Sequence, residues 1–291
     1  MKKCLILVNA YIKSETNLYQ AKRLKQELEN MGVSVGLKRN DYFASFVNGE
    51  NLKEIENYDF CIYLDKDKYI PLMLEKQGLK LFNSYYSLEV CDDKMITFIT
   101  LANNKIPMPK TMAGLMCYDK AEPLKTESLD MVEKSLGYPL IVKESFGSLG
   151  KGIYLVNNRQ ELLVLAEKLK CTPHLFQQFV ANSKGRDIRV IVVGGKVVAS
   201  MMRVSTTDFR SNVELGGTAT AYQINNELKS LCEKVAKILK LDYCGIDILI
   251  EKNNYLVCEV NSNAYFGGIE RVTGINVAKA FAEHIYNTIY K

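Results

Sequence analysis

The sequence has few of the features that would assign its 291 residues to a special class of protein. Its apolar runs fall well short of the roughly 20 residues of a transmembrane helix, and its first residues lack the apolar segment of a signal peptide. Its eight cysteines include no Cys-x-x-Cys pair, which favours reduced thiols and a cytoplasmic location over disulfides or zinc. The net charge is only +5 and no basic tract is interleaved with aromatic residues, so neither a membrane nor nucleic acid is an expected partner.

Several common catalytic motifs are also missing. The two histidines, His174 and His284, lie far apart with no partner at ligand spacing, and we interpret both as structural. There is no Gly-x-Ser-x-Gly nucleophile elbow. No Gly-x-Gly-x-x-Gly motif follows the first predicted strand, so a dinucleotide is not an expected cofactor.

The first 90 residues alternate between apolar runs and amphipathic segments. Apolar runs at residues 4–8, 33–37, 59–64 and 79–82 predict strands, while residues 18–31 and 69–76 predict helices. The alternation is typical of an open α/β sheet, which binds ligands at the strand ends, here at Asn9 and Ala10. Further helices are expected at residues 88–103, capped by Ser87, and at residues 277–290, capped by Asn276.

Two β-branched runs within residues 245–261 flank Lys-Asn-Asn and predict a β-hairpin. With the turn centred on Asn253, Asp247 lies opposite Glu259, and Asn261 follows on the same face. Two carboxylates about 5 Å apart repel by roughly 3 kcal/mol at an effective dielectric near 20. A divalent cation such as Mg²⁺ would remove this conflict, since it prefers oxygen ligands. The alternative is an exposed hairpin with solvated acids.

A glycine-rich turn at residues 146–152 follows a predicted strand that ends with Lys143. Backbone N–H groups and an ammonium are suited to phosphate oxygens, although the spacing is not that of a Walker A loop. Arg189, Arg203 and Arg210 could bind a carboxylate or a phosphate with two parallel hydrogen bonds. Taken alone, Lys143 and each of the three arginines could equally be a solvated surface charge, and a glycine-rich turn alone is weak evidence of phosphate binding.

Together these motifs occur in the order found in the ATP-grasp ligases, and the sequence most closely resembles the RimK type, whose members add glutamate to proteins or cofactors. The resemblance covers residues from about 88 to the C-terminus. It is carried by residues 185–194 (GRDIRVIVVG), 208–212 (DFRSN), 216–217 (GG), 245–249 (GIDIL), 258–261 (CEVN) and 268–276 (GIERVTGIN).

The resemblance implies a mixed α/β fold with an N-terminal open α/β domain at residues 1–90. A two-lobed ATP-grasp domain would follow, with a small lobe carrying the glycine-rich flap at residues 91–180 and a C-terminal lobe carrying the metal site at residues 181–291. ATP would lie between the two lobes, together with Mg²⁺ or Mn²⁺ as two ions.

The resemblance also implies a set of site residues. Asp247, Glu259 and Asn261 would bind the metal, and Arg203 and Arg210 would stabilise the acyl phosphate or the tetrahedral intermediate. The residues expected to bind the nucleotide are Lys94, Lys143, Gly147, Ser148, Gly150, Gly152, Gln177, Gln178, Phe179, Asp187, Arg189 and Asn212.

The activity implied is that of an ATP-dependent carbon–nitrogen ligase, which joins an amino acid such as glutamate to an amine or peptide acceptor through an acyl phosphate. Relatives form dimers or tetramers, so a homo-oligomer is compatible. One alternative is a peptide-modifying ligase that makes side-chain ester or amide crosslinks. The other is a non-catalytic nucleotide-binding protein, which the intact metal and phosphate residues disfavour.

The sequence departs from the family pattern at two places. Gln178 stands where such ligases usually have glutamate, which leaves its role toward the nucleotide open. The family's usual Asn-Ala-Ser-Pro-Gly is here residues 261–268 (NSNAYFGG), in a loop that faces the acceptor in relatives. Tyr265 and Phe266 therefore predict a different acceptor, unless the loop has simply drifted.

Overall fold

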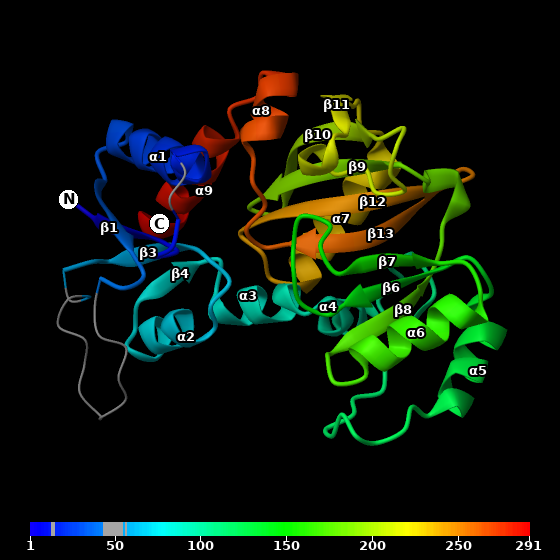
Figure 1. Cartoon of the computed structure of the whole chain (residues 1–291). Coiled ribbons are helices and arrows are strands. Elements are labelled where there is room, and N and C mark those ends of the chain that lie inside the picture. The colour runs from blue at the N-terminus through cyan, green and yellow to red at the C-terminus, as the bar shows by residue number, and fades with distance from the viewer. Residues whose placement is uncertain (13–14, 43–54, 56) are drawn as a thin grey trace.

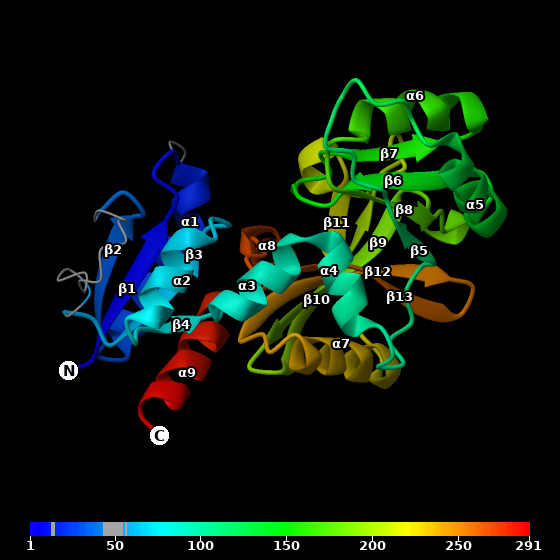
Figure 2. The same cartoon turned by 90° about the horizontal axis from the view of Figure 1, so that it is seen from below.

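The computed structural model describes residues 1–12, 15–42, 55 and 57–291, and the strands in these ranges form three sheets (Figure 1). The predicted mixed α/β class is confirmed. An N-terminal α/β unit lies beside a two-lobed unit, and the chain between them runs through the two short helices α3 and α4 (Figure 2). None of the described helices combines the length and the apolar composition that a membrane span requires.

The first sheet is parallel, with the strand order β2-β1-β3-β4. Its strands are β1 (Lys3–Val8), β2 (Ser34–Arg39), β3 (Phe60–Leu64) and β4 (Lys80–Phe82). Alternate residues of β1 face two different cores, because side chains alternate along a strand. Cys4 and Ile6 pack with helix α1 (Glu15–Asn30), whereas Leu5 and Leu7 pack with helix α2 (Tyr69–Lys76).

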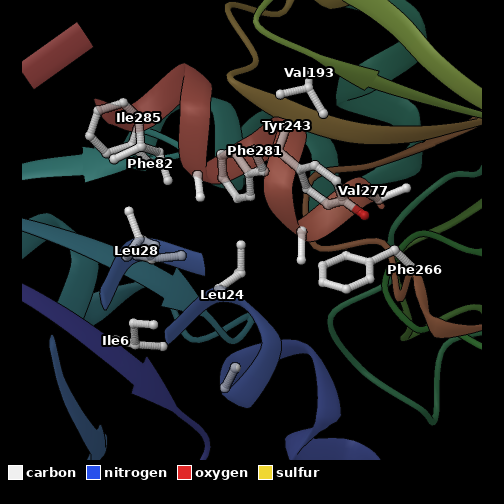
Figure 3. Close-up of a cluster of buried hydrophobic side chains, with 14 of the residues drawn as sticks. Ile6, Leu24, Leu28, Phe82, Val193, Tyr243, Phe266, Val277, Phe281 and Ile285 are labelled. Atoms are coloured by element: carbon white, nitrogen blue, oxygen red, sulfur yellow. The ribbon is translucent and has the colours of Figure 1, made fainter. Parts of the chain in front are cut away.

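The C-terminal helix α9 (Val277–Ile289) packs against α1 and completes the first of these cores. Phe281 lies between Leu24 of α1 and Tyr243, and Leu28 and Ile285 belong to the same core (Figure 3). The two ends of the chain therefore share one hydrophobic core. The proposed division of the chain at residues 90 and 180 stays a prediction.

The helix expected over residues 88–103 is two helices, α3 (Tyr85–Asp92) and α4 (Lys94–Leu101). Asp93 separates them, since it adopts an extended backbone and its side chain caps α4 by accepting hydrogen bonds from the N–H groups of Met95 and Ile96. The cap of α3 is Ser84, and the assignment to Ser87 was wrong. The Ser87 hydroxyl instead donates to the carbonyl of Lys240.

The small lobe has an antiparallel sheet with the order β5-β8-β6-β7, covered on its outer face by two helices (Figure 2). Its elements are β5 (Thr111–Ala113), α5 (Thr126–Leu136), β6 (Leu140–Glu144), β7 (Ile153–Val156), α6 (Arg159–Leu169) and β8 (His174–Gln178). The glycine-rich turn connects β6 to β7.

The C-terminal lobe has an antiparallel sheet with the order β11-β10-β9-β12-β13. Its elements are β9 (Arg186–Val193), β10 (Lys196–Val204), β11 (Thr218–Ala221), α7 (Asn226–Ile238), β12 (Tyr243–Glu251) and β13 (Asn254–Asn261), followed by the short helix α8 (Gly267–Thr273). Helix α7 covers the face formed by Ile188, Val190 and Val192 of β9.

The opposite face of β9 changes character halfway along the strand. Ile191 and Val193 pack against α9 and the N-terminal unit, whereas Asp187 and Arg189, earlier on the same face, line a cavity. One face of one strand thus docks the N-terminal unit at one end and presents charged side chains to the cavity at the other.

The predicted hairpin forms, but its turn is the two residues Lys252-Asn253 and is not centred on Asn253. Next to the turn the pairing is therefore one residue away from the predicted register, and Ile248 pairs with Val257. A β-bulge shifts the register back, so that Asp247 pairs with Glu259 as predicted. The extra residue, Cys258, lets Val257 and Val260 both reach the core under α7, although they are three positions apart. The predicted pairing of Asp247 with Glu259 is therefore confirmed, and the bulge is what produces it.

Asn83 joins the N-terminal unit to the C-terminal lobe. Its buried amide donates to the carbonyls of Tyr243 and Ser262 at 2.7 and 2.8 Å and accepts from the N–H groups of Asp242 and Tyr243 at 2.7 and 3.0 Å. We expect Asn83→Ala to lower the free energy of unfolding by about 2–3 kcal/mol, because it leaves buried backbone groups unpaired. Urea unfolding measures this loss, and the exposed Asn254→Ala should change stability by less than about 0.5 kcal/mol. Equal effects of the two changes would contradict the assigned role.

Candidate functional site

A cavity of about 330 Å³ lies between the small lobe, the C-terminal lobe and the N-terminal unit. The structure brings most of the predicted site residues to its lining: Lys143, Ser148, Gly150, Gln177, Gln178, Phe179, Asp187, Arg189, Arg203, Arg210, Asn212, Asp247, Glu259 and Asn261. Lys94, Gly147 and Gly152 do not line it and lie around the glycine-rich turn. The assignment of roles to these residues stays a prediction.

Charged residues form a row across four strands of the C-terminal lobe. The registers place Arg203 of β10 opposite Asp187 of β9, and Asp247 of β12 opposite both Arg189 of β9 and Glu259 of β13. Side chains opposite each other in neighbouring strands lie on the same face, so this row forms one wall of the cavity.

Asp247 is held by two arginines. Its carboxylate accepts hydrogen bonds from Arg189 at 2.7 and 2.6 Å, and one of its oxygens also lies 3.0 Å from Arg203. Burial alone would raise the pKa of Asp247, but Arg189 and Arg203 outweigh burial and lower this pKa to about 2. Asp247 is therefore ionised at neutral pH, and part of the conflict with Glu259 is relieved by arginine rather than by metal.

Glu259 and Asn261 make no side-chain hydrogen bond or ion pair within the part of the chain that the structure describes, although both line the cavity. Their free carboxylate and amide oxygens, with the remaining capacity of Asp247, are a donor set that suits a hard divalent cation. Among the described residues no three His, Cys, Asp or Glu side chains gather as a metal site. An ion here would need Asn261 and oxygen ligands from a substrate.

Two lysines are buried next to the glycine-rich turn. Lys94 donates to the carbonyl of Gly147 at 3.0 Å, and Lys143 has the Cys258 thiol at 3.5 Å. Neither forms an ion pair within the described ranges, although Lys94 is 6% and Lys143 4% exposed. Burial lowers the pKa of Lys94, and the attraction of the Glu259 carboxylate offsets only part of this effect. A buried ammonium without a counter-ion is costly, which favours an anionic ligand at this place.

The glycine-rich turn, which we call the flap (residues 146–152), rests on the segment after β10. Gly150 has a φ of +73°, and its carbonyl accepts from Arg210 at 2.6 Å. A Cβ at Gly150 would lie 3.2 Å from the side-chain oxygen of Asn212. Glycine therefore allows both the left-handed backbone and this close approach. Arg210 is engaged by the flap and by Asp208, so its contacts are those of a flap anchor.

The segment predicted to meet adenine lies at the end of β8. Gln177 is buried and its amide donates to the Thr111 hydroxyl at 2.9 Å. The Gln178 side chain accepts from the N–H of Lys110 at 3.3 Å. A glutamine oxygen can serve this contact as well as a carboxylate would, and the role of Gln178 toward a nucleotide stays open. Phe179, next along the chain, lines the cavity.

Residues 263–266 divide between the cavity and the core. Asn263 and Tyr265 line the cavity, and the Tyr265 ring lies 6.2 Å from the ring of Tyr19 in the N-terminal unit. Phe266 is fully buried against Tyr243, so the expectation that it faces a substrate was wrong (Figure 3). Its size reflects packing between the two units.

Several cavity residues were not predicted as site residues from the sequence, and Lys66 is the one that comes from the N-terminal unit. Lys66 follows β3 of the N-terminal unit and reaches the same cavity. The available signal was its position, directly after a strand of an open α/β sheet, where such sheets bind ligands. Asn9 was predicted to lie at a strand end that binds a ligand. In the structure its side-chain amide donates to the Asp65 carboxylate at 2.9 Å.

Comparison with known proteins gives consistent relatives. A sequence model of the RimK-like ATP-grasp domain matches residues 91–285. N-acetylaspartylglutamate synthase A from Homo sapiens is 36% identical over 223 residues, covering 76% of this chain and 56% of that protein. A probable alpha-L-glutamate ligase from Maridesulfovibrio salexigens is 35% identical over 214 residues, covering 72% of this chain and 68% of that protein. The chain thus spans about half the length of the human relative.

The fold has solved counterparts. The ATP-grasp ligase PsnB complexed with a minimal precursor aligns with a TM-score of 0.73 and 17% identity, over 98% of this chain and 99% of that one. This likeness establishes the two-lobed ATP-grasp fold. Because the family model spans most of the sequence, including every strand of both lobes, the chain belongs to the RimK-like ATP-grasp family.

Proposed function

We propose that this protein is an ATP-dependent carboxylate–amine ligase that forms an amide bond through an acyl phosphate. Membership of the RimK-like ATP-grasp family supports this reaction type. The human relative is considerably longer than this chain, so the proposal depends chiefly on the chain's own cavity.

One observation carries the proposal. The cavity sets a buried lysine without a counter-ion beside oxygen ligands without a partner: Lys143 contacts Cys258, the neighbour of Glu259, and Asn261 lies two residues further on. A group that satisfies both needs must be anionic and must bring a divalent cation. Magnesium-bound nucleoside triphosphate has this chemistry.

The reaction proceeds in two steps. A substrate carboxylate oxygen attacks the γ-phosphorus of ATP, the bond to ADP breaks, and an acyl phosphate forms. The amine then attacks the acyl carbon, phosphate leaves with the bonding electron pair, and the nitrogen loses a proton to give the amide. Lys94 and Lys143 offset charge on the phosphoryl group during the first step, so catalysis rests on positioning and electrostatics.

Mg²⁺ would be held by Asp247, Glu259 and Asn261, and it would neutralise charge on the transferring phosphoryl group. Two ions are proposed on the family resemblance. Arg203 is only 3% exposed and is held by both Asp187 and Asp247, so we assign it a positioning role. Arg210 holds the flap, which excludes water that would hydrolyse the acyl phosphate.

Glutamate is the proposed amino acid, because the names of the human and bacterial relatives both contain it. A peptide-modifying ligase remains the second candidate. PsnB, which shares the fold, was solved with a minimal precursor, and Tyr265 gives the cavity an aromatic wall beside Tyr19 of the N-terminal unit.

The test combines the protein with Mg-ATP, isotope-labelled glutamate and a pool of cellular small molecules and peptides. We expect ADP release that requires both a carboxylate and an amine, and a product that has gained one labelled residue by mass spectrometry. A peptide that loses one water without taking up label would instead support the crosslinking candidate. Absence of ADP release with every pool would contradict both.

A further inference from the structure

We propose that Lys66, supplied by the N-terminal unit, binds the terminal phosphoryl group of ATP at the reacting end of the cavity. The inference rests on the proposed function, since it takes ATP as the ligand. It adds a third lysine to Lys94 and Lys143 and gives the N-terminal unit a direct part in the reaction.

The backbone before Lys66 is held at the carboxyl end of the first sheet. The Asp65 carboxylate accepts from the Asn9 amide at 2.9 Å and from the Asn40 amide at 2.7 Å. Its other oxygen accepts from the N–H of Lys66 at 2.8 Å. Residues that follow β1 and β2 therefore hold the backbone next to Lys66 in place.

The backbone after Lys66 is held equally well. The Asp67 carboxylate accepts from the Tyr63 hydroxyl at 2.9 Å and from the N–H groups of Tyr69 and Ile70 at 3.2 and 3.1 Å at the start of α2. Asp65 and Asp67 thus clamp a short loop on both sides. Lys66 is the residue of this loop that lines the cavity.

The same loop meets the flap. The Lys68 ammonium lies 4.7 Å from the centre of the Phe146 ring, at the start of the flap. Lys66 itself lies 3.6 Å from Asp92, two residues before Lys94. This ion pair is long, and the Lys66 side chain stays 41% exposed, so its ammonium can take a further anionic partner.

The position of Lys66 distinguishes the phosphoryl end from the base end of the cavity. β3 and α2, which flank Lys66, lie to the left in Figure 1, whereas the connection from β8 to β9, predicted to meet adenine, lies to the right. A nucleotide with its base at that connection extends its phosphates toward the N-terminal unit. Its terminal phosphate then lies nearest to Lys66.

The charge of the cavity favours a polyanion. Six lysine and arginine side chains line it, against three aspartates and glutamates. Asp187 and Asp247 are already paired with Arg203 and Arg189. Arg210 is paired with Asp208, and Lys66 has only the long contact with Asp92, so Lys143, Arg186 and the loosely held Lys66 face the one remaining carboxylate of the lining, Glu259. A triphosphate with its metal matches this excess better than a single carboxylate does.

The test compares binding of Mg-ADP with that of a magnesium-bound, non-hydrolysable ATP analogue by calorimetry. We expect Lys66→Gln to weaken binding of the analogue about tenfold, because a charge-assisted hydrogen bond is lost, and to change ADP affinity less than about twofold. Lys66→Arg should largely restore analogue binding. The matched control is the exposed Lys76→Gln on α2, which removes the same charge and should change neither affinity.

Equal weakening of both nucleotides, or no weakening of either, would overturn the role of Lys66 while leaving the ligase proposal standing. If the wild-type protein binds neither nucleotide, the proposed function itself fails. Thermal unfolding of Lys66→Gln should match that of the wild type, since the side chain is partly exposed. A large loss of stability in both Lys66 variants would show a structural role and would also overturn the inference.

Discussion

Replacing Glu259 with glutamine is expected to lower ATP turnover at least about 100-fold. The change removes a negative charge that faces the cavity and keeps the shape of the side chain. Glu259 has no ion pair or hydrogen bond in the described ranges, so the fold should not depend on it. ADP release, measured as a function of Mg²⁺ concentration, should show both a lower rate and a higher Mg²⁺ requirement.

The matched control is Glu251→Gln, at the end of β12 beside the turn of the same hairpin. It removes the same charge outside the cavity lining, and we expect wild-type turnover. Wild-type turnover and Mg²⁺ dependence in Glu259→Gln would rule out the proposed metal site. Urea unfolding of both variants should agree within about 0.5 kcal/mol.

Replacing Asp247 with alanine is expected to cost about 3–5 kcal/mol of folding stability in addition to activity. The Arg189 side chain is 15% exposed and donates both of its side-chain hydrogen bonds within the described ranges to Asp247, so its guanidinium would be left buried and unpaired. Urea unfolding measures the loss. The exposed pair of Lys25 and Glu29 provides the contrast, since Glu29→Ala should cost less than about 1 kcal/mol.

A double variant separates the charge effect from simple loss of packing. Combining Arg189→Met with Asp247→Ala removes both partners, and it should be more stable than Asp247→Ala alone. A double variant that is less stable would contradict the ion-pair explanation. The pH gives a second check. Because the pKa of Asp247 is lowered from 3.8 to about 2, its contribution is complete above pH 3.8 and is lost as the pH falls toward 2.

The hairpin of β12 and β13 illustrates both the reach and the limit of sequence patterns. Alternation predicted two paired strands and placed Asp247 opposite Glu259, which the structure confirms. The pairing nevertheless depends on the bulge at Cys258, which the alternation of side chains does not reveal. The reason is that a bulge is selected by the need of Val257 and Val260 to reach one core, and that core is formed by a helix elsewhere in the chain.

The misjudged residues have a common cause. Phe266 was assigned to a substrate loop, but it fills the core between the two units. Ser87 was assigned as a cap, but it bonds a carbonyl more than 150 positions away. Lys66 was overlooked because the other residues that line its cavity come from segments distant in sequence. Each depends on contacts between segments that are distant in sequence, about which local patterns carry no information.

Local patterns in the sequence were sufficient to predict the α/β class, most of the helices and strands, and a set of lysines, acids and amides that the fold brings to one cavity. Periodicity and turn chemistry express local preferences, and the side-chain chemistry restricts what a site can bind. Only the tertiary structure decided that Asp247 is held by arginines, that α9 closes the N-terminal core, and that Lys66 reaches the cavity. These outcomes depend on how three sheets pack together, because burial and pairing are properties of the assembled chain and not of any one segment.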